Sequence, residues 1–138
     1  MVKEGVHRRI ALAGNPNVGK STLFNRLTGL HQHTGNWPGK TVGMAVGAVN
    51  FQGNSVELID LPGTYSLTGS SEDEQIAAEF IASGEADCII AVCDGSCLQR
   101  TLILALQILQ RTEHMVICIN LMDEATRRGI SIDGAGLE

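Results

Sequence analysis

The stretch that decides the fold, Gly14–Thr22, reads GNPNVGKST. It matches the pattern Gly-x-x-x-x-Gly-Lys-Ser/Thr, in which backbone N–H groups surround a polyphosphate, the lysine neutralises its charge and the hydroxyl holds Mg²⁺. The apolar run 9–13 before it predicts a strand, and residues 21–27 after it predict a helix. Phosphates would then meet a helix N-terminus with free N–H groups. The sequence therefore predicts a nucleotide-binding P-loop.

The composition sets loose bounds on the rest of the molecule. The 138 residues are 43% hydrophobic and 18% charged, which is typical of a globular domain, and we treat 1–138 as one domain. A net charge of −5 argues against a nucleic-acid partner, because phosphate backbones attract clustered Lys and Arg. No apolar run approaches the ~18 residues of a membrane span, and we expect no signal peptide.

Strands and helices alternate along the chain, which predicts an α/β fold with a mainly parallel sheet covered by helices on both faces. A polar loop is expected over 30–40. Strands are predicted at 42–48, 56–59, 88–93 and 115–119, the first two forming a hairpin, with helices starting at Ser71 and over 98–109. The last strand would leave an uncovered apolar edge, so we expect a C-terminally truncated fold.

The cysteines and two neighbouring histidines offer a metal site as an alternative interpretation. The cysteines lie in or beside expected strands: Cys88, Cys93, Cys97 and Cys118. Zinc sites usually combine two Cys or His pairs, and only one such spacing is present here, so we expect reduced thiols. His31 and His33 lie in the expected polar loop, where solvated imidazoles are commoner than metal ligands.

Two further motifs indicate guanine nucleotides. Asp60–Gly63 reads DLPG, whose aspartate would hold Mg²⁺ through water and whose glycine N–H would meet a γ-phosphate. Asn120–Asp123 reads NLMD, and the Asp123 carboxylate can accept hydrogen bonds from N1–H and the amino group of guanine. Adenine offers neither donor, and discrimination of this kind commonly reaches ~10⁴-fold. Three motifs in order at strand ends, where α/β sheets bind ligands, predict GTP.

These motifs make the chain resemble the G domain of the ferrous iron transport protein B (FeoB) family. The resemblance is carried by GNPNVGKSTLFNRLTG (14–29), GNWPGKTV (35–42), DLPGTYSL (60–67) and NLMDEA (120–125), and it runs from about residue 8 to the end. It implies a P-loop NTPase of the Ras-like kind, with a mostly parallel sheet and one antiparallel hairpin strand.

The resemblance also implies the residues of the site. Nucleotide contacts are expected from Gly14, Asn15, Pro16, Asn17, Val18, Gly19, Lys20, Ser21, Thr22, Gly39, Thr41, Asp60, Leu61, Pro62, Gly63, Asn120, Leu121, Met122 and Asp123. Lys20, Thr41, Gly63 and Asn17 would support hydrolysis, and Ser21, Thr41 and Asp60 would hold Mg²⁺. Asn17 matches an asparagine that helps to coordinate K⁺ in potassium-activated GTPases; the alternative is a turn residue that only stabilises the loop.

The function implied is a slow GTPase that binds GTP, GDP, Mg²⁺ and K⁺ and regulates a ferrous-iron transporter. Thr64 stands where Ras-like enzymes carry a water-orienting glutamine, so we expect a rate at or below ~10⁻⁴ s⁻¹. A helical spacer and a membrane permease of the same full-length chain would be partners, at the cytoplasmic face of the bacterial inner membrane. The alternatives are a soluble ribosome-assembly GTPase and a nucleotide sensor with negligible turnover, and the oligomeric state stays open.

Overall fold

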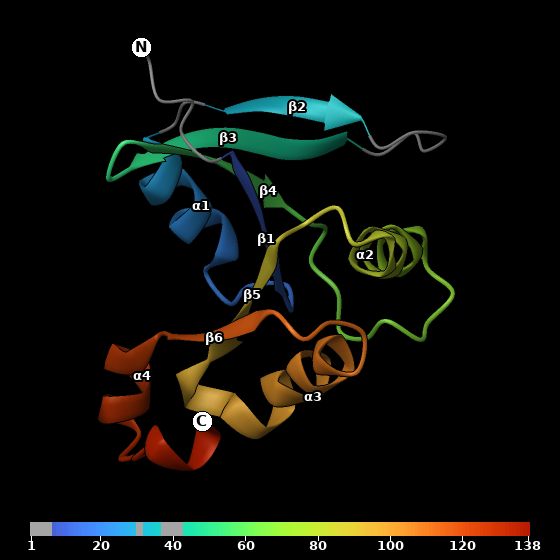
Figure 1. Cartoon of the computed structure of the whole chain (residues 1–138). Coiled ribbons are helices and arrows are strands. Elements are labelled where there is room, and N and C mark those ends of the chain that lie inside the picture. Colours follow the sequence, from blue (N-terminus) through green and yellow to red (C-terminus); the bar gives the residue numbers. More distant parts are fainter. Residues whose placement is uncertain (1–6, 30–31, 37–42) are drawn as a thin grey trace.

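The computed structural model describes residues 7–29, 32–36 and 43–138 (Figure 1). The expected contacts Gly39 and Thr41, and also His31, lie outside these ranges, and for His33 only the backbone is described. The strands are β1 (Arg8–Gly14), β2 (Gln32–Asn36), β3 (Gly43–Phe51), β4 (Asn54–Asp60), β5 (Cys88–Asp94) and β6 (Met115–Asn120). The helices are α1 (Lys20–Thr28), α2 (Glu72–Ser83), α3 (Leu98–Leu109) and α4 (Met122–Arg127), with 3₁₀ turns η1 (Gly95–Cys97) and η2 (Ala135–Leu137).

The strands form a sheet in the order β2-β3-β4-β1-β5-β6. The four strands from β4 to β6 are parallel, whereas β3 runs antiparallel to both β2 and β4. The predicted α/β class with a mainly parallel sheet is therefore observed. The prediction of a loop is wrong for Gln32–Asn36, which pair with β3; polar residues and glycine hide this strand because it lies at the sheet edge.

The predicted hairpin joins β3 to β4 by a tight turn. Gln52 and Gly53 both have positive φ, at 51° and 79°, which is the combination that a type I′ turn requires. The predicted start of α2 is also present, because the Ser71 hydroxyl accepts a hydrogen bond from Glu74 N at 3.2 Å. The helix ends at Gly84 in the left-handed conformation.

Two apolar layers hold helices against the two faces of the sheet. On one face, α2 and α3 bury Ile76, Phe80 and Ile108 in the same cluster as Ile89 of β5. On the other face, Phe24 of α1 packs with strand residues. Figure 1 shows α1 and the pair α2–α3 on opposite sides of β1. The carboxyl ends of β1, β4, β5 and β6 are thereby held at one edge, where the motifs meet.

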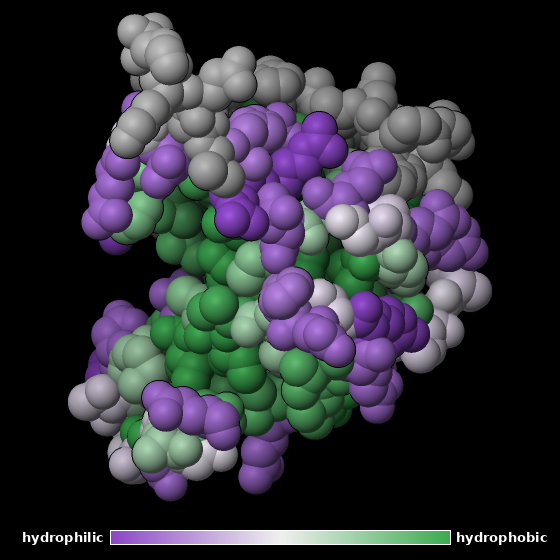
Figure 2. Space-filling model, in the orientation of Figure 1, coloured by the Kyte–Doolittle hydropathy of each residue, from purple (hydrophilic) through white to green (hydrophobic). Residues whose placement is uncertain are grey.

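Strand β6 is the last in the order of the described strands, as the sequence predicts. Val116 on this strand is 54% exposed, and on α3 Ile103, Leu106 and Leu109 are exposed too. Figure 2 shows apolar surface over this part of the molecule. Among the described helices, none has the length and apolar character that crossing a bilayer requires.

Candidate nucleotide-binding site

The P-loop leaves β1 at Gly14 and enters α1 at Lys20, as the sequence predicts. Two of its residues are left-handed, Asn17 at φ 67° and Gly19 at φ 83°. At Gly14 a Cβ atom would lie 2.9 Å from the Val92 carbonyl oxygen, so only glycine fits there. The motif's glycines and Asn17 therefore give the loop its tight curvature around the N-terminus of α1.

A cavity of about 420 Å³ lies inside this curve. Its lining consists of Asn15, Pro16, Asn17, Gly19, Lys20, Ser21, Thr22 and Gly63. Seven of these come from the P-loop motif and one from DLPG, although the two segments are far apart in the sequence. The structure therefore brings together most of the residues expected to surround phosphates.

Lys20 is buried and its charge is paired within the protein. Its ammonium group donates to the Asp60 carboxylate and, at 2.7 Å, to the Leu61 carbonyl oxygen. The side chains of Lys20 and Asp60 are only 9% and 14% exposed, so water screens the pair weakly. The P-loop and the DLPG motif are thus joined by an ion pair at the wall of the cavity.

The donor set fits a magnesium-bound polyphosphate. Ser21 offers a hydroxyl oxygen and Asp60 a carboxylate, which are hard ligands that Mg²⁺ prefers. Lys20 can neutralise phosphate oxygens at the same wall. The Oδ1 atom of Asn15 is shielded from solvent and has no hydrogen-bond partner among the described residues, so an acceptor is left free beside the cavity for a cation or a bound water.

Asn120 of the NLMD motif contacts the P-loop directly. Its Nδ2 donates to the Val18 carbonyl oxygen at 3.0 Å. A Cβ atom at Gly19 would lie 2.3 Å from the same Nδ2, which explains the absence of a side chain there. The end of β6 is therefore fastened to the loop that opens α1.

Asp123 lies in the first turn of α4 and is mostly exposed. Its carboxylate pairs with Arg127 at 3.3 Å, and 77% of its side chain is accessible. Leu121, in the left-handed conformation at φ 59°, turns the chain between Asn120 and this helix. The Met122 sulfur lies close to Gly95 of η1, so Met122 packs against the turn after β5. Asp123 is thus accessible to a ligand, but it does not line the phosphate cavity.

Thr64, directly after DLPG, is buried and lies outside the lining of the phosphate cavity. It is 4% exposed, and its backbone N–H donates to the Gly14 carbonyl oxygen at 3.1 Å. It does not line the phosphate cavity, whereas Gly63 does. The side chain at this position is therefore buried rather than presented to a reacting water.

The sequence reasoning missed the contacts that α3 makes with the segment after DLPG. Gln107 accepts from the Leu67 backbone N–H at 2.7 Å, and the Arg100 guanidinium lies 6.0 Å from the centre of the Tyr65 ring. The available signal was Gln107 itself, the one polar residue within the apolar run 102–109, for which a hydrogen-bond partner is expected.

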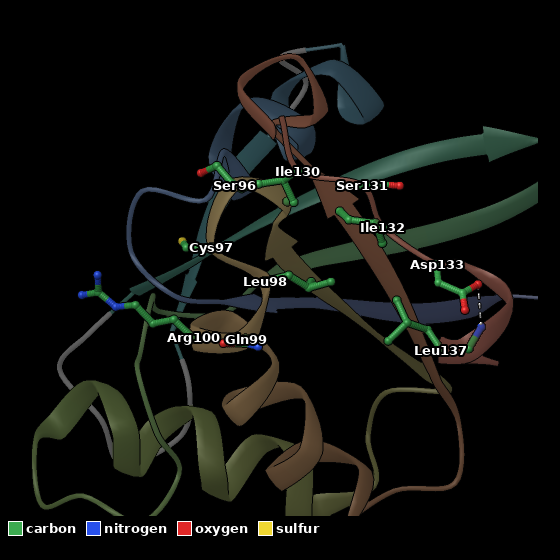
Figure 3. Close-up of a pocket in the computed structure, with 12 residues that line it drawn as sticks. Ser96, Cys97, Leu98, Gln99, Arg100, Ile130, Ser131, Ile132, Asp133 and Leu137 are labelled. Carbon is green, nitrogen blue, oxygen red and sulfur yellow. Dashed lines mark hydrogen bonds between the residues drawn. The ribbon is translucent and has the colours of Figure 1, made fainter. Parts of the chain in front are cut away.

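A larger cavity, of about 680 Å³, lies between η1, the start of α3 and the segment 130–137. Figure 3 shows Leu98, Ile132 and Leu137 around it, while the Arg100 side chain extends away from these apolar groups. None of the P-loop, DLPG or NLMD residues lines it. Size alone therefore does not mark the phosphate site, which is defined by its N–H groups and charges.

The turn after β5 carries a carboxylate with a perturbed pKa. Desolvation alone would raise the pKa of Asp94, but hydrogen bonds from the Ser96 hydroxyl and backbone N–H outweigh it, and the pKa lies below its ordinary value. Asp94 therefore stays ionised and fixes η1 through a short turn.

The cysteines are free thiols, as the sequence predicts. Cys93 is buried and the other three are half-buried. Burial raises the pKa of Cys88, Cys93 and Cys97, which favours the protonated thiol. In the described part of the chain, no group of three or more His, Cys, Asp or Glu side chains could hold a metal ion.

Comparisons with known proteins agree with this geometry. The family model for ferrous iron transport protein B matches residues 8–138. The Fe(2+) transporter FeoB of Legionella pneumophila (strain Lens) is 48% identical over 131 residues, covering 92% of this chain and 17% of the relative. The chain thus spans about a sixth of the length of such curated relatives.

Solved structures of related proteins have the same fold. The G domain of the T. maritima FeoB iron transporter gives a TM-score of 0.88 at 43% identity, covering 96% of this chain and 80% of that one. The cytosolic domain of that transporter in its GMPPNP form gives 0.88 at 45%, covering 94% and 52%. Together with the family match, this shows that the chain belongs to the ferrous iron transport protein B family and has the fold of its G domain.

Proposed function

We propose that this chain binds GTP and GDP with Mg²⁺ in the P-loop cavity and hydrolyses GTP slowly. The observation that carries the proposal is the meeting of three distant motifs at one edge of the sheet. The cavity is lined by the P-loop and Gly63, and Asn120 is hydrogen-bonded to the same loop. The GDP and GMPPNP forms of a 44–45% identical cytosolic domain support the choice of guanine nucleotides.

The phosphate end of the site would use the charges already gathered at its wall. Lys20 would exchange its contact with Asp60 for the β- and γ-phosphate oxygens, which frees the carboxylate. Ser21, Asp60 and Thr41 would hold Mg²⁺, which neutralises charge developing on the transferred phosphoryl group. The Gly63 N–H would donate to the γ-phosphate. GDP lacks that group, so only GTP would engage Gly63.

The base end of the site would select guanine through NLMD. The exposed Asp123 carboxylate is free to accept two hydrogen bonds once it leaves Arg127, and Asn120 keeps the motif beside the P-loop. Leaving a surface ion pair of this kind costs less than about 1 kcal/mol. The guanine contacts easily exceed that cost, because they satisfy both donors of the base.

Thr64 supports a slow intrinsic rate of hydrolysis, and Asn17 supports stimulation of that rate by potassium. The side chain of Thr64 is buried and does not line the cavity, so it would not orient an attacking water. Asn17 lies exposed at the cavity, and its amide oxygen is available to a potassium ion. A K⁺ ion there would supply positive charge opposite the phosphates, in the place where other GTPases use an arginine.

In the cell, this domain would act as the regulatory switch of a ferrous-iron transporter. The matching curated relatives are Fe(2+) transporters, of which this chain corresponds to 17%. The permease and helical spacer of the same full-length protein would then be its partners, at the cytoplasmic face of the bacterial inner membrane. Nucleotide-dependent movement of the segment after DLPG would carry the signal.

A nucleotide sensor with negligible turnover is the second candidate, favoured by the buried Thr64. A single-turnover GTP hydrolysis assay in K⁺ and in Na⁺, on wild type and Asn17→Ala, separates the two. The GTPase proposal expects faster turnover in K⁺ for wild type and no cation dependence for the variant. Turnover at the uncatalysed rate in both salts, with GTP fully bound, would favour the sensor.

A further inference from the structure

The segment that follows DLPG lies against α3. The backbone N–H of Leu67 donates to Gln107 Oε1 at 2.7 Å, and the Ser66 hydroxyl donates to the same oxygen at 3.3 Å. Both contacts join residues about forty positions apart in the chain. One amide oxygen on α3 therefore fixes the backbone of this segment.

The buried apolar face of α3 determines where Gln107 lies. The neighbouring Leu104 and Ile108 are buried in the core, so α3 cannot rotate to move Gln107 elsewhere. Gln107 is half-buried, and it satisfies its acceptor with a backbone donor that has no strand partner. The contact is thus set by the packing of α3 rather than by a mobile surface side chain.

A second side chain on the same face of α3, two helical turns before Gln107, also contacts this segment. Arg100 precedes Gln107 by seven residues, a spacing that places both on one side of α3. Its guanidinium lies 6.0 Å from the centre of the Tyr65 ring, within cation–π distance. Arg100 contacts Tyr65 while Gln107 contacts Ser66 and Leu67, so both side chains support consecutive residues.

The supported segment begins at the wall of the phosphate cavity. Gly63 lines that cavity, with Pro16 3.4 Å from the position of a Gly63 Cβ. The next residue, Thr64, is fixed by its N–H bond to Gly14, and Leu67 is buried at 6% exposure. Only two residues, Tyr65 and Ser66, separate these fixed points. Leu67 lies only four positions after Gly63, so the contacts at Thr64 and Leu67 together fix the short stretch of chain that follows Gly63.

We infer that Gln107 is a positioning residue for the γ-phosphate contact of Gly63, acting through Leu67, with Arg100 as a secondary support. This inference rests on the proposed function. Because GDP has no γ-phosphate, the contact affects GTP binding and hydrolysis while GDP binding stays unchanged.

The test compares Gln107→Met, which removes the acceptor at similar size, with Gln107→Glu, which keeps an acceptor oxygen. Gln99→Met, an exposed glutamine on the same helix, is the matched control. Gln107→Met should bind GDP within about twofold of wild type, but lose about fivefold or more in GMPPNP affinity and in single-turnover GTP hydrolysis, the effect of one hydrogen bond. Gln107→Glu and Gln99→Met should behave as wild type.

Three results would overturn the inference. One is wild-type GMPPNP affinity and hydrolysis in Gln107→Met. Another is an equal loss of GDP and GMPPNP affinity, which would indicate general disruption. A third is a Gln107→Glu variant as impaired as Gln107→Met.

Hydrogen exchange in nucleotide-free protein tests the same contact without any reliance on GTP. The segment 64–68 should exchange faster in Gln107→Met than in wild type, Gln107→Glu or Gln99→Met. Unchanged exchange in Gln107→Met would contradict the positioning role. A wild type that binds no guanine nucleotide would contradict the proposed function, and the exchange experiment would still show whether Gln107 holds the segment 64–68 in place.

Discussion

The side-chain amide of Asn120 donates a hydrogen bond to the backbone carbonyl of Val18 at 3.0 Å. The two residues are 102 positions apart, and the bond joins the end of β6 to the loop that precedes α1. It couples the motif proposed to select guanine to the motif proposed to hold phosphates. The spacing between base and phosphate subsites is thus fixed by protein contacts before a ligand arrives, which lowers the ordering cost of binding.

Replacing Asn120 by Ala should weaken both the fold and nucleotide binding. The Val18 carbonyl loses its donor, which costs about 1 kcal/mol of unfolding free energy and at least about fivefold in GDP affinity. Denaturant unfolding and calorimetric titration with GDP measure the two effects. Asn50→Ala, at an exposed site on β3, is the control. Unaltered stability and GDP affinity in Asn120→Ala would show that this hydrogen bond does not couple the guanine motif to the P-loop.

The Lys20–Asp60 ion pair should show strong coupling in a double-mutant cycle. Both side chains are largely buried, so Lys20→Met leaves the Asp60 carboxylate without its cation. The double variant Lys20→Met/Asp60→Asn should be more stable than the sum of the single effects predicts, by about 1–3 kcal/mol. Thermal and denaturant unfolding of the four proteins without nucleotide gives this value. Additive effects would mean that the pair contributes no specific interaction.

Asp123→Ala should lower the affinity for GDP while leaving the unfolding free energy almost unchanged. The carboxylate is 77% exposed and its partner is the surface residue Arg127, so the unfolding free energy should change by less than about 0.5 kcal/mol. GDP affinity should nevertheless fall by about 100-fold or more, because two donors of the base lose their acceptor. Arg127→Ala should keep wild-type GDP affinity. If Asp123→Ala retained full GDP affinity, guanine selection would have to come from other residues.

Asp94 should make stability depend on pH in the acidic range. Its pKa in the folded protein lies below the ordinary value of 3.8, so its contribution is present above that pH and is lost as the pH falls through the folded pKa. The wild type should therefore exceed Asp94→Asn in unfolding free energy at neutral pH, and the difference should shrink below pH 3.8. Denaturant unfolding across this range checks the sign. A difference that grows in acid would contradict it.

The sequence was sufficient for the parts of the fold that local chemistry decides. The P-loop pattern, the helix start at Ser71 and the β3–β4 hairpin each carry their own local signal, and all three occur as predicted. Strand β2 carries no such signal. Its residues are polar or glycine, and only pairing with β3 makes them a strand.

The site could be predicted as a set of motifs but not as a set of contacts. Three motifs in order placed Gly63, Asn120 and the P-loop at one edge, because parallel strands end together. The pairing of Lys20 with Asp60 and the contact of Gln107 with Leu67 depend on how side chains pack across long sequence separations. No spacing rule encodes such contacts, so they became visible only in three dimensions.

Calorimetric titration of this chain with GDP, GMPPNP and ATP, each with Mg²⁺, tests the central claim most directly. We expect GDP and GMPPNP to bind, ATP to bind at least about 1,000-fold more weakly, and Lys20→Ala to lose the guanine nucleotides. ATP binding as tight as GMPPNP binding would contradict the account of guanine selection. Full GDP and GMPPNP affinity in Lys20→Ala would contradict the P-loop as the phosphate site.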